Sequence, residues 1–313
     1  MTIAATSLHP RRVHIGRGDA VPAAFWIAGA YLVTAFAAGL PLDGPVATMV
    51  ATVVFLAGGM PHGAYDIALL TRSTRLRGSG LGLAILAYIG VASAMAVLWL
   101  IVPIAALVLF LAVAAIHFGE DWTMLDEPLL KIAAGTAILA APAIGHPVTV
   151  AQLFVSMAGS PSGELIARAM IAVAPVALLV TIVGIGAAWR EGAREWAAAT
   201  ASAIMVLIVV PPVMSFALFF VFLHSPRHLT AARVLLADMP RTRWLATGAV
   251  MSALAIGGWL IFASQTDGLP ADTTAQAFQL LAAVALPHLL LSRWLERRLE
   301  QRVDRPPVSP QVT

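Results

Sequence analysis

Five histidines lie within or at the ends of long apolar runs, where an ionisable side chain is costly and therefore marks a candidate functional site. They are His62, His117, His224, His228 and His288. His224 and His228 are four residues apart, so in a helix their imidazoles share one face, a spacing that suits two ligands of one metal ion. Neutral imidazole is a common ligand of iron, zinc, copper and nickel. Any one of these histidines alone would more often be a hydrogen-bond partner between helices.

Carboxylates follow two of these histidines at helical spacing. Asp66 comes four residues after His62. Its carboxylate is therefore predicted either to accept a hydrogen bond from that imidazole or to pair with Arg227. Two carboxylates three and four residues after His117 are expected either to support His117 in the same way or to face solvent; these are Glu120 and Asp121.

The composition indicates that these residues are positioned by membrane helices. Of the 313 residues, 60% are hydrophobic and only 11% are charged, against about 25% charged in an ordinary soluble domain. A soluble protein of this size lacks the charge to cover its surface, so an integral membrane protein is predicted. There is no cysteine, so any metal must be held by histidines or carboxylates. The basic residues form no single patch, which gives nucleic-acid binding no support.

The apolar runs predict an all-α, polytopic transmembrane bundle of about ten spans. Eight or nine spans are also possible, because Pro103 and the Pro211-Pro212 pair mark either hairpins or kinks within longer helices. The segment 145–163 is expected to be re-entrant or interfacial. The ten runs lie at 21–39, 45–70, 81–101, 103–119, 130–143, 165–189, 196–211, 212–235, 244–263 and 273–294.

Lysine and arginine gather on alternate connections of this ten-span arrangement, as the positive-inside rule requires. With the N-terminus inside, 17 of the 19 basic residues are cytoplasmic, and Arg168 and Arg227 are the other two. The sequence thus predicts a multi-pass protein of the cell inner membrane with both termini cytoplasmic. It divides into an N-terminal tail at 1–20, a transmembrane domain with the metal site at 21–296 and a C-terminal tail at 297–313. The five histidines then fall within roughly 5–15 Å of the cytoplasmic boundary, which suggests a single site.

Four segments around these histidines, GGMPHGAYD, HFGEDW, HSPRH and LPHLLL, resemble the Brp/Blh family of membrane-bound beta-carotene dioxygenases of bacteria and archaea. The resemblance implies that His62, His117, His224 and His228 bind a non-haem Fe(II) ion. His288 matches a further family histidine, and we assign it with Asp66 to the catalytic machinery around the metal. The implied reaction is cleavage of the central double bond of beta-carotene by O2 to give two retinal molecules, with a microbial rhodopsin as recipient.

A hydrocarbon substrate has no polar group, so its recognition requires an apolar tunnel. Candidate lining residues are the aromatics Phe118, Trp122, Phe216, Phe219, Phe220 and Phe222. One alternative function is cleavage or oxidation of another carotenoid. The other is a non-enzymatic proton- or metal-coupled transporter, in which Asp66, Arg227 and the histidines form a relay. A retinal-binding opsin is disfavoured because the only lysine, Lys131, lies beside a loop.

Overall fold

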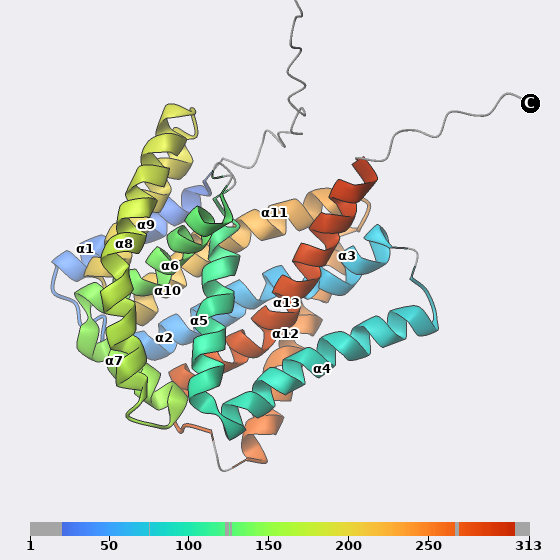
Figure 1. Cartoon of the computed structure of the whole chain (residues 1–313), viewed down its shortest axis with the longest axis horizontal. Helices are drawn as coiled ribbons and strands as arrows, with labels where there is room; N and C mark the ends of the chain where they lie inside the picture. Colours follow the sequence, from blue (N-terminus) through green and yellow to red (C-terminus); the bar gives the residue numbers. More distant parts are fainter. Residues whose placement is uncertain (1–20, 75, 123–124, 126, 267–268, 304–313) are drawn as a thin grey trace, which may run out of the picture.

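The computed structural model describes residues 21–74, 76–122, 125, 127–266 and 269–303, with the side chain of Arg297 but not those of 296 and 298–303. The described residues form helices and no strand (Figure 1). The predicted N-terminal tail lies outside them, and the last helix continues to Val303, past the predicted boundary at 296. The elements are α1 Ala23–Ala37, α2 Pro45–Gly59, η1 Met60–Tyr65, α3 Asp66–Ser73, α4 Ser79–Ile101, α5 Pro103–Gly119, α6 Pro128–Gly145, α7 Pro147–Ala158, α8 Gly163–Arg190, α9 Arg194–Val209, α10 Pro212–Phe219, η2 Phe220–His224, α11 Ser225–Leu235, α12 Arg241–Ser264 and α13 Thr273–Val303.

The all-α, apolar architecture predicted from the sequence is confirmed, whereas the count of ten spans stays a prediction. Six helical segments of the described chain are long and apolar enough to cross a membrane, and α1, α5 and α7 are shorter apolar helices. Pro103 begins α5 directly after α4, and Pro212 begins α10 after α9, so these prolines mark the starts of new helices and not kinks within longer ones. The segment 145–163 contains α7, whose 12 residues reach about 18 Å. That is less than the bilayer core of about 30 Å.

Two histidine-bearing segments are broken helices, and in each the break lies at the histidine. Between α2 and α3 the backbone forms the 3₁₀ turn η1, which contains Pro61 and His62. Between α10 and α11 the backbone forms the π-turn η2, which ends at His224, two residues before Pro226. Proline removes a backbone hydrogen bond and disfavours a regular helix, and π-turns recur at functional sites. The helix geometry is therefore locally altered where these two imidazoles are presented.

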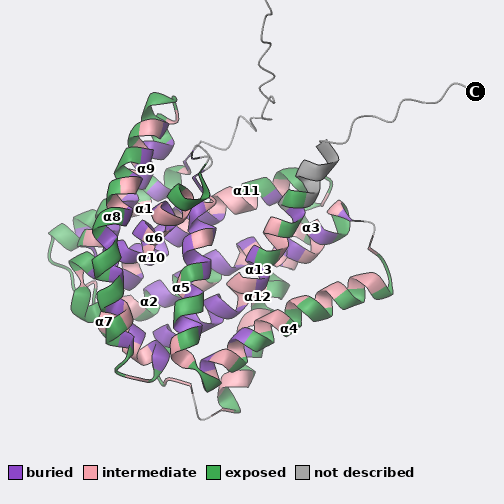
Figure 2. Ribbon diagram, in the orientation of Figure 1, coloured by how far each residue is buried: buried purple, intermediate pink, exposed green. Residues whose placement is uncertain are grey.

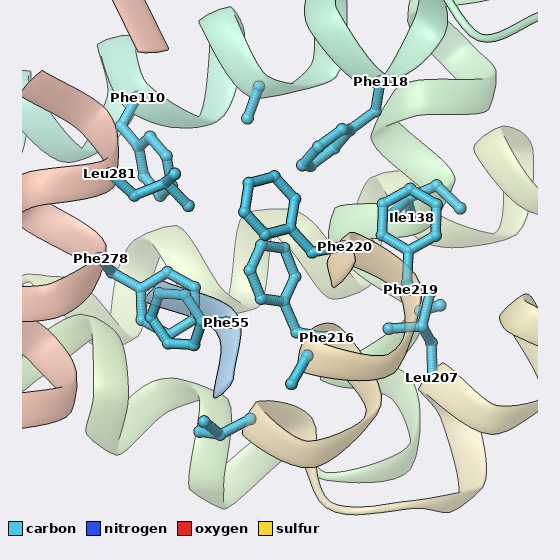
Figure 3. Close-up of a cluster of buried hydrophobic side chains, with 14 of the residues drawn as sticks. Phe55, Phe110, Phe118, Ile138, Leu207, Phe216, Phe219, Phe220, Phe278 and Leu281 are labelled. Carbon is cyan, nitrogen blue, oxygen red and sulfur yellow. The ribbon is translucent and has the colours of Figure 1, made fainter. Parts of the chain in front are cut away.

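A cluster of buried aromatic rings fills the centre of the bundle beside these breaks (Figure 3). Phe216 stacks on Phe220 with ring centroids 5.3 Å apart, and it also packs against Phe55 and Phe278. By contrast, α4, α8 and α12 are mostly exposed or half-buried (Figure 2). Most of their exposed residues are apolar, as expected of surfaces that face lipid, and the exposed charged residues lie near the helix ends, as Glu164, Arg190 and Arg241 do.

Glycine permits the close crossing that holds α5, the helix of His117, against α6. A Cβ atom at Gly135 would collide with the carbonyl oxygen of Ala115 and the amide nitrogen of Gly119, both backbone atoms of the α5 helix. Backbone cannot move aside as a flexible side chain can, so a larger residue there forces the two helices apart.

We therefore expect Gly135→Ala to destabilise the protein by about 1–3 kcal/mol, the usual effect of overpacking, or more. The matched control is Gly257→Ala on α12, where the added Cβ would meet no atom within 4 Å. Thermal unfolding in detergent measures both variants. Equal unfolding temperatures for the two would show that the α5–α6 contact is not tight.

Candidate metal centre

The structure brings all five membrane histidines together. They come from five different elements, η1, α5, η2, α11 and α13. In nine of their ten pairs the ring centroids lie between 4.5 Å, for His224 and His228, and 6.3 Å, for His228 and His288. Four of the rings are buried and the His228 side chain is 25% exposed. A cluster of imidazoles this dense is a geometry that metal sites share.

Four of the imidazoles are held by a partner at Nδ1, which leaves Nε2 for the interior of the cluster. His62 pairs with the Gly59 carbonyl oxygen at 2.5 Å. The others pair with carboxylates: His117 with Glu120 at 3.1 Å, His224 with Asp121 at 2.8 Å and His288 with Asp66 at 2.9 Å. Metal-binding histidines typically donate their second N–H to a carboxylate or carbonyl oxygen in this way.

Three of the inward nitrogens form the tightest group. Potential ligand atoms of His62, His117 and His224 all lie within 4.8 Å of one another. The Nε2 atoms of His117 and His224 are only 3.2 Å apart. When Nδ1 carries the proton on both rings, both Nε2 atoms are acceptors and repel each other, so a cation between them relieves the contact.

His228 and His288 lie beside this group and differ in their contacts. His228 Nε2 is 3.4 Å from Asp121 Oδ1 without a hydrogen bond between them, so the contact is electrostatic. Asp121, His224 and His228 form a second group of potential ligands within 4.8 Å. The buried His288 Nε2 makes no hydrogen bond to any described residue. Both rings thus present a nitrogen atom that a bound cation would satisfy.

The carboxylates surround the histidines with negative charge. Glu120 also pairs with the Arg293 guanidinium at 2.9 Å. Among the described residues, the ion pairs of Asp66 and Asp121 are with histidines alone. Burial disfavours the ionised form of Asp121, but the hydrogen-bonded His224 and the nearby His228 outweigh the effect of burial and lower the carboxyl pKa below its usual range. The arrangement therefore favours positive charge at the centre of the cluster.

The two partners predicted for Asp66 were both wrong. Its carboxylate binds His288 and accepts a hydrogen bond from the Tyr88 hydroxyl at 2.8 Å. The prediction assumed an α-helix, but residues 60–65 form a 3₁₀ turn, where positions 62 and 66 no longer share a face. Arg227 instead lies over the Trp196 ring, 4.1 Å from its centroid.

An apolar pocket opens beside the cluster and is lined by residues that include His62, His117 and His288. Of the six aromatics proposed for a tunnel, Phe118 and Phe220 line this pocket and the other four do not. Phe216 and Phe219 instead belong to the packed core shown in Figure 3. Helices α4, α12 and α13 supply much of the wall, through residues that include Tyr88, Met251, Ala255, Leu281 and Val284.

Tyr88 is the functional candidate that the sequence analysis missed. It lies in the middle of α4, otherwise an almost wholly apolar helix. A lone tyrosine in such a helix is itself a signal, because a hydroxyl group in the bilayer interior needs a partner. Nothing in the sequence indicates that this partner is Asp66.

Comparison with known proteins matches most of the chain to one family. The sequence profile of a family described as beta-carotene 15,15'-dioxygenase matches residues 51–296. A protein of Halobacterium salinarum named probable beta-carotene 15,15'-dioxygenase Blh is 26% identical over 292 residues, which covers 80% of this chain and 84% of that protein. A beta-carotene 15,15'-dioxygenase of an uncultured marine bacterium, 66A03, is 27% identical over 267 residues, covering 81% and 94%. No solved structure shows a significant match.

Proposed function

Because this chain belongs to the beta-carotene 15,15'-dioxygenase family, we propose that it cleaves the central double bond of beta-carotene with O2. The balance is simple: the C=C bond breaks and each of its carbons takes one oxygen atom of O2, giving two molecules of the aldehyde retinal. The relatives carry this activity in their names. Cleavage or oxidation of another carotenoid is the alternative, and retinal transfer to a microbial rhodopsin remains an expectation from the resemblance alone.

The observation that carries the proposal is the cluster of inward-facing imidazoles backed by carboxylates. Its donor chemistry fits Fe(II), for which imidazole and carboxylate are suitable ligands. The buried Asp66 and Asp121 favour a divalent cation, and unsatisfied nitrogens of His228 and His288 face the same region. We propose His62, His117, His224 and His228 as the ligands.

Bound Fe(II) would supply the activation of O2 and of the substrate double bond. The residues of the protein would orient the ligands and exclude water. Asp121 and Glu120 hold His224 and His117 with Nδ1 protonated, so that Nε2 keeps its lone pair for the centre. Phe118 and Phe220 line the pocket next to the histidines, where they exclude water from the reacting carbons.

The position of the pocket supports entry of the substrate from the bilayer. Its walls include Tyr88 of α4 and Met251 of α12, and Met251 is 40% exposed. Apolar neighbours of these residues face outward, with Ile89 54% and Leu254 63% exposed. Beta-carotene dissolved among lipid chains can therefore reach the pocket between α4 and α12 without crossing a polar surface.

The orientation in the inner membrane is part of the proposal, with both termini cytoplasmic. A reporter that is active only in the cytoplasm is expected to give a signal when fused to either terminus, because 17 of the 19 basic residues then lie inside. A fusion to the loop between α7 and α8 is the control and should be silent. An inactive C-terminal fusion would indicate an odd number of spans.

Metal analysis of the purified protein tests the proposed site. We expect about one iron per chain, loss of retinal formation after chelation and recovery on adding Fe(II) under anaerobic conditions. An absorption spectrum with a Soret band would instead identify a haem carrier. A protein that retains no iron and leaves beta-carotene intact would support the metal- or proton-coupled transporter.

A further inference from the structure

We infer that Tyr88 is a positioning residue of the metal site, acting on His288 through Asp66. This inference rests on the proposed function. Its basis is a chain of two hydrogen-bonded contacts that begins at the pocket wall: the Tyr88 hydroxyl donates to Asp66 Oδ2 at 2.8 Å, and both Asp66 oxygens lie 2.9 Å from His288 Nδ1.

Asp66 needs both of these donors. It is only 4% exposed, and a buried carboxylate is strongly destabilised unless its oxygens are hydrogen-bonded. Among the described residues, the side-chain donors to Asp66 are His288 of α13 and Tyr88 of α4. The two donors come from helices that pack side by side (Figure 1). Removing the Tyr88 hydroxyl would leave Asp66 held from one side only.

Loss of the Tyr88 hydroxyl would affect the metal site because Asp66 fixes the orientation of the His288 ring. Nδ1 is fixed on the carboxylate, and the opposite nitrogen, Nε2, is buried. The centroid of the His288 ring lies 5.2 Å from that of His62 and 5.1 Å from that of His117. A carboxylate that tilts would rotate the imidazole and move Nε2. Tyr88 therefore adds a layer of support of the kind that fixes ring orientation at metal sites.

Tyr88 also lines the substrate pocket, so one side chain belongs to both the pocket wall and the support of the site. Helix α4 carries none of the five histidines, and this hydrogen bond ties it to them. Loss of the hydroxyl alone should therefore affect the metal site and leave the shape of the pocket intact.

The test compares Tyr88→Phe with Tyr65→Phe, a matched control that also loses one hydroxyl. The Tyr65 hydroxyl donates to the Trp244 carbonyl oxygen at 3.0 Å, and Tyr65 does not line the pocket. Co(II) is titrated into metal-free protein, because its visible spectrum reports the ligand geometry directly. We expect Tyr88→Phe to weaken Co(II) binding about tenfold, the lower end of the effect of an outer partner, and to alter the spectrum. Tyr65→Phe should match the wild type.

Kinetics on the iron-loaded protein provide the second measurement. Tyr88→Phe is expected to lower kcat about tenfold and to leave KM for beta-carotene within about twofold, because the ring that lines the pocket is kept. Asp66→Asn should produce the same spectral change. The double variant Asp66→Asn/Tyr88→Phe should equal Asp66→Asn alone, since residues that act through one another are not additive.

Three results would overturn the inference: a Co(II) spectrum of Tyr88→Phe identical to that of the wild type, additive effects in the double variant, or a raised KM with kcat unchanged. The last result would mean that Tyr88 only shapes the pocket. If Tyr88→Phe does not fold, the Asp66→Asn spectrum decides alone, and an unchanged spectrum overturns the inference. Failure of the wild type to bind Co(II) or to form retinal would contradict the proposed function instead.

Discussion

His224→Ala is expected to abolish iron binding and retinal formation together. His224 is the most enclosed of the five histidines, with no exposed surface. Its Nε2 lies 3.2 Å from that of His117, and its Nδ1 is held by Asp121 at 2.8 Å. Alanine removes a central ligand and leaves Asp121 buried without its closest partner, in a site where water cannot replace either.

Iron per chain and retinal per minute, measured on the same preparation, check this expectation. His146→Ala is the control, because that half-buried histidine precedes α7 and binds the carbonyl oxygen of Val209, the last residue of α9. We expect iron below a tenth of the wild-type content in His224→Ala and an unchanged content in His146→Ala. Full iron in His224→Ala would mean that the metal lies elsewhere.

His228→Ala and His288→Ala are expected to have different effects on iron binding. His228 shares Asp121 with His224 in a group of potential ligands within 4.8 Å, whereas His288 is in neither such group of the described residues. His228→Ala should therefore lose iron almost as completely as His224→Ala. His288→Ala should keep measurable iron and slow retinal formation by about 10–100-fold, the typical effect of losing an outer partner.

The same paired measurement of iron and turnover separates these outcomes. If His288→Ala loses its iron and His228→Ala keeps it, His288 is the fourth ligand and His228 is not. The contact of His288 Nδ1 with Asp66 and the buried, unsatisfied His288 Nε2 would then be features of a metal-binding histidine. Loss of iron in both variants would indicate five ligands.

The gathering of the histidines was predictable because it follows from two simple regularities. The positive-inside rule predicts the direction of each span from arginine and lysine, and the distance of a histidine from the nearest basic residue then predicts its depth. His62 and Arg72, ten residues apart, illustrate this. In the structure His62 lies within 6.0 Å, between ring centroids, of each of the four other histidines, from which it is far separated in sequence.

Contacts within the site were less predictable because they depend on local helix geometry. The spacing of His62 and Asp66 predicted a contact in a regular helix, but the 3₁₀ turn directs His62 to Gly59 and Asp66 to His288. The partners of Asp66 come from α4 and α13, and the sequence does not show which helices are neighbours. The pocket lining was misjudged for a similar reason: Phe216 and Phe220 lie one turn apart, yet of the two only Phe220 faces the pocket.

The most direct test of the proposed reaction is the product stoichiometry of the purified, iron-loaded protein supplied with beta-carotene and a measured amount of O2. The proposal predicts two retinal molecules formed and one O2 consumed for each beta-carotene, with no product from the metal-free protein. Two unequal aldehydes would place the cleavage at another double bond, and full activity without metal would contradict the histidine-bound iron centre.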